Sequence, residues 1–414
     1  MVTTATDPTL ETVWRTHRPR VLAALLRRHG DAGDCEDAAQ EALLAASEQW
    51  PSEGLPDDPG AWLVRVASRR LVDRVRSDEA RRAREEVVAR QTGALHRGVV
   101  PEGEQEPVAV PDDVVEMMLR CCHPALSPSS RVALTLRAVG GLSTRQVAAG
   151  FLVPEATMAQ RISRARATLA AADASFGAPD PAELPERMAA VRHVVSLVFT
   201  EGHQRSSGDA VVDGAFVGEG LRLARVLHEA CPQDPENAGL LALLLLTAAR
   251  TPARTDASGD LVPLDEQDRG LWDPSLIREG VGLLEVCLPL GAVGQFQLQA
   301  AVAAVHAEAA RPEDTDWRQI LVLYRMLDDV APSAATTVAL ATATAEVEGP
   351  SAGLAVLDRV KDPRWHRVHA VRGHLLARTG DIAGARGCWV EAARLTRSIR
   401  EQRHLNALIG QLER

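Results

Sequence analysis

The most informative residues lie on one helix, expected at 155–172. Its polar face carries Thr157, Gln160, Arg161, Arg164 and Thr168. Its opposite face carries Met158, Ile162, Ala165 and Leu169 at helical spacing, and should be buried. Amide and guanidinium groups read base edges in the major groove of DNA, and Arg, Thr and a helix N-terminus bind phosphates. The pattern favours DNA recognition, although the solvated face of an ordinary helical hairpin would look similar.

The residues before this helix predict a helix-turn-helix. Gly140 and Gly141 interrupt the chain, Ser143 is a typical N-cap residue, and residues 144–150 supply two helical turns. Pro154 then opens the next helix at its first turn, where a missing N–H costs nothing. The second helix of such a unit is the one that enters the major groove.

Two neighbouring segments near the N-terminus carry opposite charge. Residues 31–58 contain nine acids and no Arg or Lys, whereas residues 61–90 contain nine Arg and five acids. The acidic helix, expected at 34–49, has a polar strip of Asp37, Gln40, Glu41 and Glu48. Its residues available for packing are Ala38, Leu43, Leu44 and Trp50. An acidic face binds DNA poorly and suits a basic protein surface.

The basic helix, expected at 59–90, has the opposite preference. Its arginines gather on one side, with Arg70 and Arg74 beside the row of Arg65, Arg69 and Arg76. The residues that can face inward are Leu63, Val66, Ala67 and Leu71. Such a helix can neutralise several phosphates of a nucleic-acid backbone. By themselves, the acidic and basic helices could equally be a solvated amphipathic pair.

The sequence lacks the patterns of catalytic and metal sites. Its six cysteines have no zinc-ligand spacing, so we expect buried or half-buried thiols. The segment 251–273 is rich in carboxylates that could hold a hard cation, namely Asp256, Asp260, Asp265, Glu266 and Asp268. Their spacing is not that of an EF-hand, and a packing loop is expected instead. Because the sequence contains no P-loop and no catalytic-triad pattern, we expect no enzymatic activity, no bound metal and no cofactor.

Length and composition predict a helical protein of two or three domains. The 414 residues are 46% hydrophobic but only 3% aromatic, which favours helices over strands. The net charge of −10 speaks against non-specific coating of DNA. There is no recognisable signal peptide, and the longest apolar run, 238–249, is too short to cross a bilayer. We expect a soluble, reduced, cytoplasmic protein.

Caps, helix breakers and hydrophobic periodicity predict helices throughout and no strand. Before residue 180 the helices are expected at 9–29, 34–49, 59–90, 112–122, 129–139, 143–150 and 155–172. Beyond it they are expected at 185–200, 213–230, 235–249, 275–288, 295–309, 316–330, 334–346, 350–360, 365–378, 382–396 and 399–412. Segments rich in Pro, Gly and Ala predict linkers at 91–111 and 175–185.

Three stretches, in order and spacing, resemble the sigma factors of RNA polymerase of the extracytoplasmic-function type. The first is D-C-E-D-A-A-Q-E-A-L-L-A-A from Asp34, and the second is P-G-A-W-L-V-R-V-A-S-R-R-L-V-D-R-V-R from Pro59. The third runs from His123 to Arg166 and includes R-A-V-G-G-L-S-T-R-Q-V-A-A-G-F-L-V-P-E-A-T-M-A-Q-R-I-S-R-A-R. The resemblance implies two small helical domains that bind polymerase and promoter DNA.

The resemblance implies a division of labour among these domains. Residues 1–90 would form region 2, residues 91–111 a linker, and residues 112–174 the helix-turn-helix of region 4. Docking on the clamp of the polymerase β′ subunit falls to Asp37, Gln40 and Glu41. Contact with the −10 promoter element falls to Arg65, Arg69, Arg70, Asp73, Arg74 and Arg76. Contact with the −35 element falls to Thr157, Gln160, Arg161 and Arg164. The β flap is the second polymerase contact implied, and no membrane is.

The C-terminal part, residues 185–414, resembles a subgroup in which the sigma factor carries a long helical extension. The resembling stretches are V-V-S-L-V-F-T-E-G-H from Val194, A-G-L-L-A-L-L-L-L-T-A-A-R-T-P-A-R-T-D-A-S-G-D-L-V-P-L-D-E-Q-D-R-G-L-W-D from Ala238, and Q-L-Q-A-A-V-A-A-V-H-A-E-A from Gln297. With the N-terminal motifs, the resemblance covers nearly the whole chain.

The spacing of small and large residues near the C-terminus is typical of a tetratricopeptide repeat. The residues concerned are Gly373, Ala385, Trp389 and Ala392. An earlier, degenerate copy is indicated by the glycines of 349–353, which match those of 380–384. Stacked helical hairpins of this kind leave a concave surface that usually binds a protein or peptide.

The sequence therefore predicts a sigma factor that directs promoter-specific initiation and is regulated in cis by its C-terminal helical domain. The alternative is a stand-alone helix-turn-helix regulator with a ligand- or peptide-binding helical solenoid. Such a regulator would need no polymerase and would bind a palindrome as a dimer.

Overall fold

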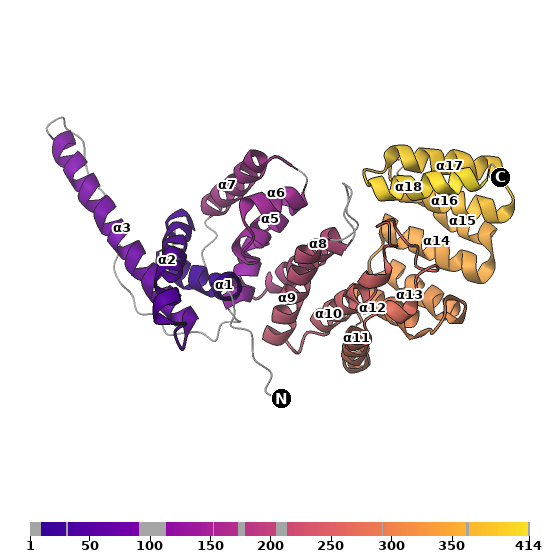
Figure 1. Cartoon of the computed structure of the whole chain (residues 1–414), viewed down its shortest axis with the longest axis horizontal. Coiled ribbons are helices and arrows are strands. Elements are labelled where there is room, and N and C mark those ends of the chain that lie inside the picture. Colours follow the sequence, from indigo (N-terminus) through magenta and orange to yellow (C-terminus); the bar gives the residue numbers. More distant parts are fainter. Residues whose placement is uncertain are drawn as a thin grey trace. The chain divides into compact units, whose positions relative to one another are not determined.

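The computed structural model shows an all-α protein (Figure 1). It describes residues 10–29, 32–90, 113–151, 153–172, 179–203, 213–291, 293–361 and 364–412. Within these ranges, extended pairing is limited to one isolated bridge between Thr255 and Leu261. The predicted all-α fold class is confirmed. The linker predicted at 91–111 and part of that predicted at 175–185 lie outside the described residues.

The helices follow one another with short connections. The first eight are α1 (Leu10–His29), α2 (Ala32–Glu53), α3 (Pro59–Arg90), α4 (Asp113–Cys121), α5 (Pro128–Ala138), α6 (Thr144–Gly150), α7 (Glu155–Ala171) and α8 (Leu184–His203). They are followed by α9 (Gly214–Ala230), α10 (Pro235–Ala248), α11 (Pro274–Cys287), α12 (Gln295–Glu308), α13 (Trp317–Val330), α14 (Ala334–Glu348), α15 (Pro350–Leu357), α16 (His366–Thr379), α17 (Ile382–Leu395) and α18 (Ile399–Gln411).

Helix boundaries lie within a few residues of the predicted ones because the capping residues can be recognised by their type in the sequence. Asp213, Asp234 and Asp273 precede α9, α10 and α11, and each accepts a hydrogen bond from a backbone N–H of the first turn. The largest differences are that α2 continues through Pro51 to Glu53, and that the segment 251–273 contains two short 3-10 turns that were not predicted.

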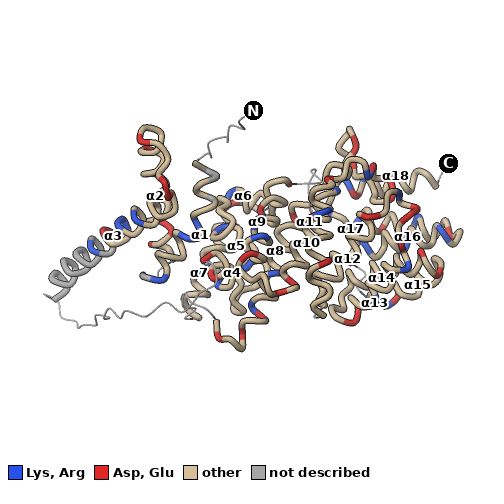
Figure 2. Tube along the Cα trace, turned by 90° about the horizontal axis from the view of Figure 1, so that it is seen from below, with Lys and Arg blue, Asp and Glu red and all other residues tan. Residues whose placement is uncertain are grey.

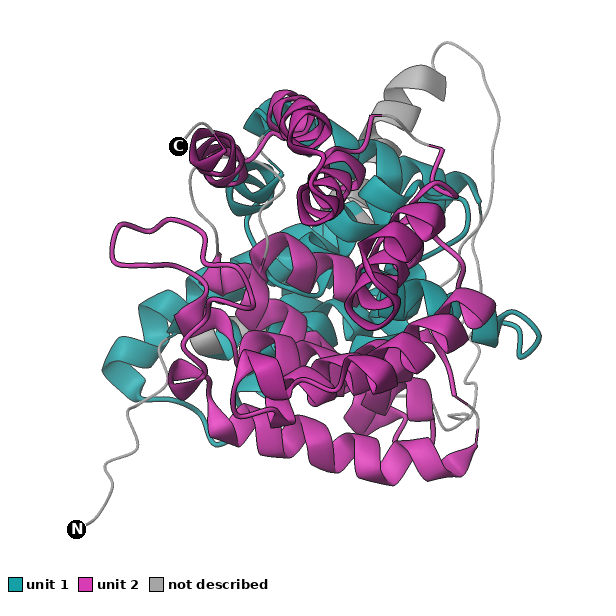
Figure 3. Cartoon of the chain, turned by 90° about the vertical axis from the view of Figure 1, so that its right-hand side faces the viewer, with its two compact units in different colours: residues 1–194 teal, residues 195–414 magenta. Residues whose placement is uncertain are grey.

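The described chain divides into two compact units, residues 1–194 and 195–414, which Figure 3 colours separately. The division falls inside α8. In the first unit, α1 packs on α2 and α3, and the helix-turn-helix of α5, α6 and α7 follows α4. In the second unit, successive helices pair from α9 to α18.

The core between α2 and α3 forms largely as predicted. Leu63, Ala67 and Leu71 of α3 are fully buried, and Trp50 at the end of α2 packs edge-on against Trp62 with 5.3 Å between ring centroids. Leu44 is a correction to the prediction, because it is 62% exposed instead of packed. Its position in the helical repeat puts it beside the acidic residues rather than on the buried stripe.

Helix α10 lies at the centre of its unit and is apolar on nearly all sides. It packs against α9, α11 and α12, which explains its run of buried leucines, Leu240, Leu241, Leu244, Leu245 and Leu246. With 14 residues it is shorter than the ~20 that a bilayer requires. No helix of the described residues is both long and apolar enough to cross a membrane.

Helices α14 to α17 form two hairpins, α14 with α15 and α16 with α17. Gly349 and Gly380 stand at their turns with positive φ of 96° and 88°. In the second hairpin the small and large positions meet as the spacing predicts, because the indole of Trp389 fills the space left by Gly373 and donates a hydrogen bond to the carbonyl of Ala370 at 3.2 Å. A helical hairpin is thus built around this glycine.

Replacing Gly373 with Ala should lower the free energy of unfolding of the second unit by about 1–3 kcal/mol. The added Cβ would lie 2.5 Å from Cδ1 of Trp389, so the two helices must separate. The matched control is Gly387→Ala on α17, where no atom lies within 4 Å of the added Cβ. The higher helix propensity of alanine should leave the stability of this variant unchanged or raise it. Urea denaturation of both variants measures the difference. Equal stabilities would contradict this account of the hairpin.

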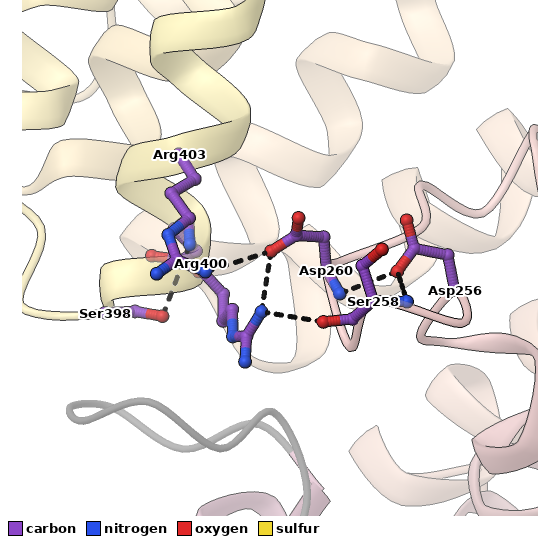
Figure 4. A network of polar contacts seen from close by, with 7 residues as sticks. Asp256, Ser258, Asp260, Ser398, Arg400 and Arg403 are labelled. Atoms are coloured by element: carbon purple, nitrogen blue, oxygen red, sulfur yellow. Dashed lines mark hydrogen bonds and ion pairs between the residues drawn. The ribbon is translucent and has the colours of Figure 1, made fainter.

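The acidic segment 251–273 is a packed loop held by its own turns and by α18 (Figure 4). Asp256 accepts hydrogen bonds from the backbone N–H groups of Ser258 and Asp260, both at 2.9 Å. The carboxylate of Asp260 pairs with Arg400 at 2.7 Å and Arg403 at 3.4 Å. The hydrogen bond from Arg400 lowers the pKa of Asp260. These carboxylates are therefore engaged with the protein.

Candidate nucleic-acid and protein interfaces

The helix-turn-helix is fixed by a reciprocal cap at the start of α6. The Ser143 hydroxyl accepts a hydrogen bond from the backbone N–H of Gln146 at 3.1 Å, and the Gln146 side-chain oxygen accepts one from the N–H of Ser143 at 2.8 Å. Ser143 was predicted as the N-cap and Gln146 was not, although a serine followed three residues later by glutamine is the usual signature of this cap. Gly141, with φ of 69°, makes the preceding turn.

Helix α7 buries one face and exposes the other, as predicted. Met158, Ile162, Ala165 and Leu169 are buried. Thr157, Gln160 and Arg164 are exposed, and Arg161 is half-buried with its guanidinium 6.0 Å from the ring of Phe151. Arg164 donates a hydrogen bond to the side-chain oxygen of Gln160 at 3.0 Å, so the two present a joint polar surface. Among the described residues, no side chain caps the N-terminus of α7, so its first N–H groups can bind a phosphate.

The acidic strip on α2 is open to solvent. The Asp37 side chain is 62% exposed, Gln40 is exposed, and Glu41 is 37% exposed. The exposed Leu44 continues the same helical stripe at i+7 from Asp37. An apolar side chain within a charged strip is a feature of protein interfaces. Leu44 is thus an interface candidate that sequence reasoning placed wrongly in the core.

The acidic strip and the basic helix are joined by Arg74. Its guanidinium pairs with Asp37 at 2.7 Å and also hydrogen-bonds Glu41, while Arg70 approaches Glu41 at 4.0 Å. The hydrogen bond with Asp37 raises the pKa of Arg74. Residues predicted for two different partners therefore meet, and Arg74 holds the carboxylates in place instead of standing free.

The other residues predicted for DNA on α3 are exposed. Arg65, Arg69, Asp73 and Arg76 all face solvent. Neither Arg65, Arg69 nor Arg76 has an ion-pair partner among the described residues. Figure 2 shows the arginines following α3 beyond the acidic residues of α2. This row of uncompensated charge can bind several phosphates.

Two charged residues not singled out from the sequence tie α1 and α2 to the helix-turn-helix. Arg18, which is 2% exposed, donates to the carbonyls of Arg137 and Ala138 at the end of α5. Burial lowers its pKa to about 10. Glu36 hydrogen-bonds Arg166 and lies 4.0 Å from Arg137. Arg18 belongs to no recognisable motif, and the acidic motif that contains Glu36 does not reveal its partner, so only long-range packing shows these contacts.

The thiols are buried or half-buried, as predicted. Cys35, Cys121, Cys122 and Cys287 are buried, and Cys231 and Cys388 are half-buried. Burial raises the pKa of Cys122 to about 12, so this thiol is protonated and unreactive at neutral pH. Over the described ranges, no group of three His, Cys, Asp or Glu side chains is arranged to hold a metal ion.

The two segments that carry these surfaces each match a known protein family. Residues 13–82, which hold the acidic and Arg-rich helices, match sigma-70 region 2, and residues 116–169, which hold the helix-turn-helix, match sigma-70 region 4. The chain thus contains region 2 and region 4 of the sigma-70 factors of RNA polymerase. The region 2 match favours a sigma factor over the stand-alone regulator considered above, since that regulator would need no polymerase-binding region. The protein is thus a DNA-binding factor of transcription initiation, in a family that is not enzymatic.

Curated relatives agree. The sigma factor is 33% identical over 165 residues to the probable ECF RNA polymerase sigma factor SigI of Mycobacterium tuberculosis, which covers 39% of this chain and 53% of that protein. It is 37% identical over 410 residues to an uncharacterized protein of Rhizobium meliloti, covering 95% of this chain and 94% of that one. The N-terminal part of the chain is therefore similar to a probable sigma factor of the extracytoplasmic-function group, over about half of that protein's length.

The C-terminal unit has its own family match. Residues 187–288 match a family of unknown function, DUF6596. The similarity to the R. meliloti protein extends through this segment and nearly to the end of the chain. No solved structure matches the chain.

Proposed function

We propose that this sigma factor docks on the β′ clamp of core polymerase through Asp37, Gln40 and Glu41, with Leu44 as an apolar contact. Helix α3 contacts the −10 element through Arg65, Arg69, Arg70, Asp73 and Arg76. Helix α7 contacts the −35 element through Thr157, Gln160, Arg161 and Arg164. Region 4 also binds the β flap of the polymerase. Arg74 keeps the role predicted near the −10 element and also orients the docking carboxylates.

The observation that supports this proposal most is the meeting of two opposite charge surfaces within the region 2 match. The exposed acids of α2 face solvent beside an exposed arginine row on α3. A basic protein surface and a phosphate backbone can therefore bind side by side. The domain organisation proposed is region 2 over 1–90, a linker over 91–111, region 4 over 112–174, and a tetratricopeptide-like extension over 185–414.

We further propose that the extension regulates promoter binding in cis. Arg18 of α1 and Glu36 of α2 contact the helix-turn-helix, so the two DNA-binding surfaces can move apart only when these contacts break. A covalently attached domain acts at an effective concentration in the mM range, enough to bias this opening.

Promoter-dependent transcription with purified core polymerase tests the regulation. The full chain is compared with a chain ending after His203, which keeps α8 whole and with it the hydrogen bond from Arg187 to the carbonyl of Leu119 at 3.3 Å. Output should change at least about fivefold on truncation, and residues 204–414 added separately at micromolar concentration should not restore it. Equal output from both chains would exclude regulation in cis while leaving sigma activity intact.

A further inference from the structure

Two adjoining cavities lie within the C-terminal unit, with volumes of about 410 and 370 Å³. Their walls come from α8, α10, α12, α13, α14 and the loop 251–273. The residues that line both are Leu243, Thr247, Arg250, Leu264 and Gln299. Volumes of this size are typical of small-molecule sites.

Arg250 stands at the junction of the two cavities without a counter-ion. Among the residues that the structure describes, no carboxylate forms an ion pair with it and no hydrogen bond of its guanidinium is found. Burial is the main cause that lowers the pKa of Arg250. The nearby phenol of Tyr324 acts in the opposite direction, and the guanidinium of Arg269 lowers this pKa further. A cation in this setting lacks the partner that buried charges normally have.

The surrounding polar groups are also left without partners. His203 Nδ1 and Gln267 Oε1 in the first cavity, and His306 Nδ1 in the second, are buried and form no hydrogen bond. Burial is the main cause that lowers the pKa of His306 to about 4, and the positive charges of Arg250 and Arg269 add to it. Unsatisfied buried polar atoms are rare in folded proteins, and three of those in this structure belong to residues that line the two cavities.

The remaining lining combines hydroxyl and amide side chains, and Arg254, which donates a hydrogen bond to the carbonyl of His203, with a larger set of apolar residues. The first cavity includes Phe199, Leu244, Leu261, Val262 and Pro263, and the second includes Val302, Ala303 and Leu327. This combination fits a molecule with one anionic group and an apolar body. A simple phosphate ion would leave the apolar walls uncovered, and a neutral lipid would leave Arg250 unpaired.

We propose that the double cavity binds a small organic anion, whose carboxylate, sulfonate or phosphate group pairs with Arg250 and whose apolar body lies against Leu243 and Leu264. The binding site lies entirely within residues 195–414 and does not depend on the proposed docking to polymerase or DNA. The ligand supplies the negative charge and hydrogen-bond partners that the protein itself does not.

Binding of a fluorescent probe to the full chain tests this site. The probe is 8-anilinonaphthalene-1-sulfonate, and its neutral counterpart with the same ring system is N-phenyl-1-naphthylamine. The test variant is Arg250→Met, and the matched control is Arg318→Met, since Arg318 is exposed on α13. We expect Arg250→Met to weaken binding of the sulfonate at least tenfold and to leave binding of the neutral probe unchanged, with Arg318→Met like the wild type. Displacement by benzoate or by phenyl phosphate then distinguishes a carboxylate from a phosphate ligand.

Thermal unfolding separates a binding role from a packing role. A half-buried arginine without a partner gains no ion pair to offset its lost hydration, so Arg250→Met should leave the melting temperature unchanged or raise it. Sulfonate probe should raise the melting temperature of the wild type and not that of the variant. Failure of the wild type to bind the sulfonate, equal sulfonate binding by Arg250→Met, or a lower melting temperature with loss of both probes would each overturn the proposal.

Discussion

Replacing Asp37 and Glu41 together with arginine should abolish binding of core RNA polymerase. Like charges brought together at an interface cost several kcal/mol, so the loss of affinity should be at least about 100-fold. The variant should remain folded. The pairs that Arg74 makes with these acids lie at the surface, where an ion pair contributes about 0–1 kcal/mol.

Binding of core polymerase to the immobilised full chain measures this effect. The matched control is Glu53→Arg, an exposed acid at the end of the same helix. This control reverses the charge of one side chain, whereas the double variant reverses two. The single variant Asp37→Arg is therefore measured as well. We expect the control to keep its affinity and Asp37→Arg to lose much of it. Equal losses at Glu53 and Asp37 would point to net charge rather than a docking strip, and full binding by the double variant would rule the strip out.

Replacing Arg161 and Arg164 together with alanine should remove the preference for the −35 element. A side chain that reads a base contributes about 1–3 kcal/mol, so the double variant should lose at least roughly 30-fold in −35-dependent initiation. Gln160 also loses the hydrogen bond from Arg164 that positions it. The buried face of α7 is untouched, so the fold should persist.

Transcription from two promoters, one with and one without the −35 element, separates recognition from simple attraction. The control is Arg145→Ala on α6, the first helix of the motif, which crosses the DNA backbone in such units. That variant should lower transcription from both promoters to the same extent and reduce the salt dependence of DNA binding. If the double variant on α7 did the same, its arginines would be phosphate contacts and the base readout would lie elsewhere.

The sequence determined the helices and the chemical character of their faces. N-caps such as Ser143 and Asp273, breakers such as Gly141, and the stripe of Met158, Ile162 and Leu169 are local patterns, so they can be read without the fold. The same holds for the acidic and basic strips and for the small-to-large match of Gly373 with Trp389. These patterns carried the resemblance to sigma factors.

Only the tertiary structure decided which charges are compensated. It paired Arg74 with Asp37, buried Arg18 against α5, joined Asp260 to Arg400 across 140 residues, and left Arg250 without a carboxylate. It also exposed Leu44, which the sequence analysis had counted among the residues available for packing. The physical reason is that a charge depends on every group within a few ångströms, and those groups come from segments whose separation in the sequence carries no periodic signal.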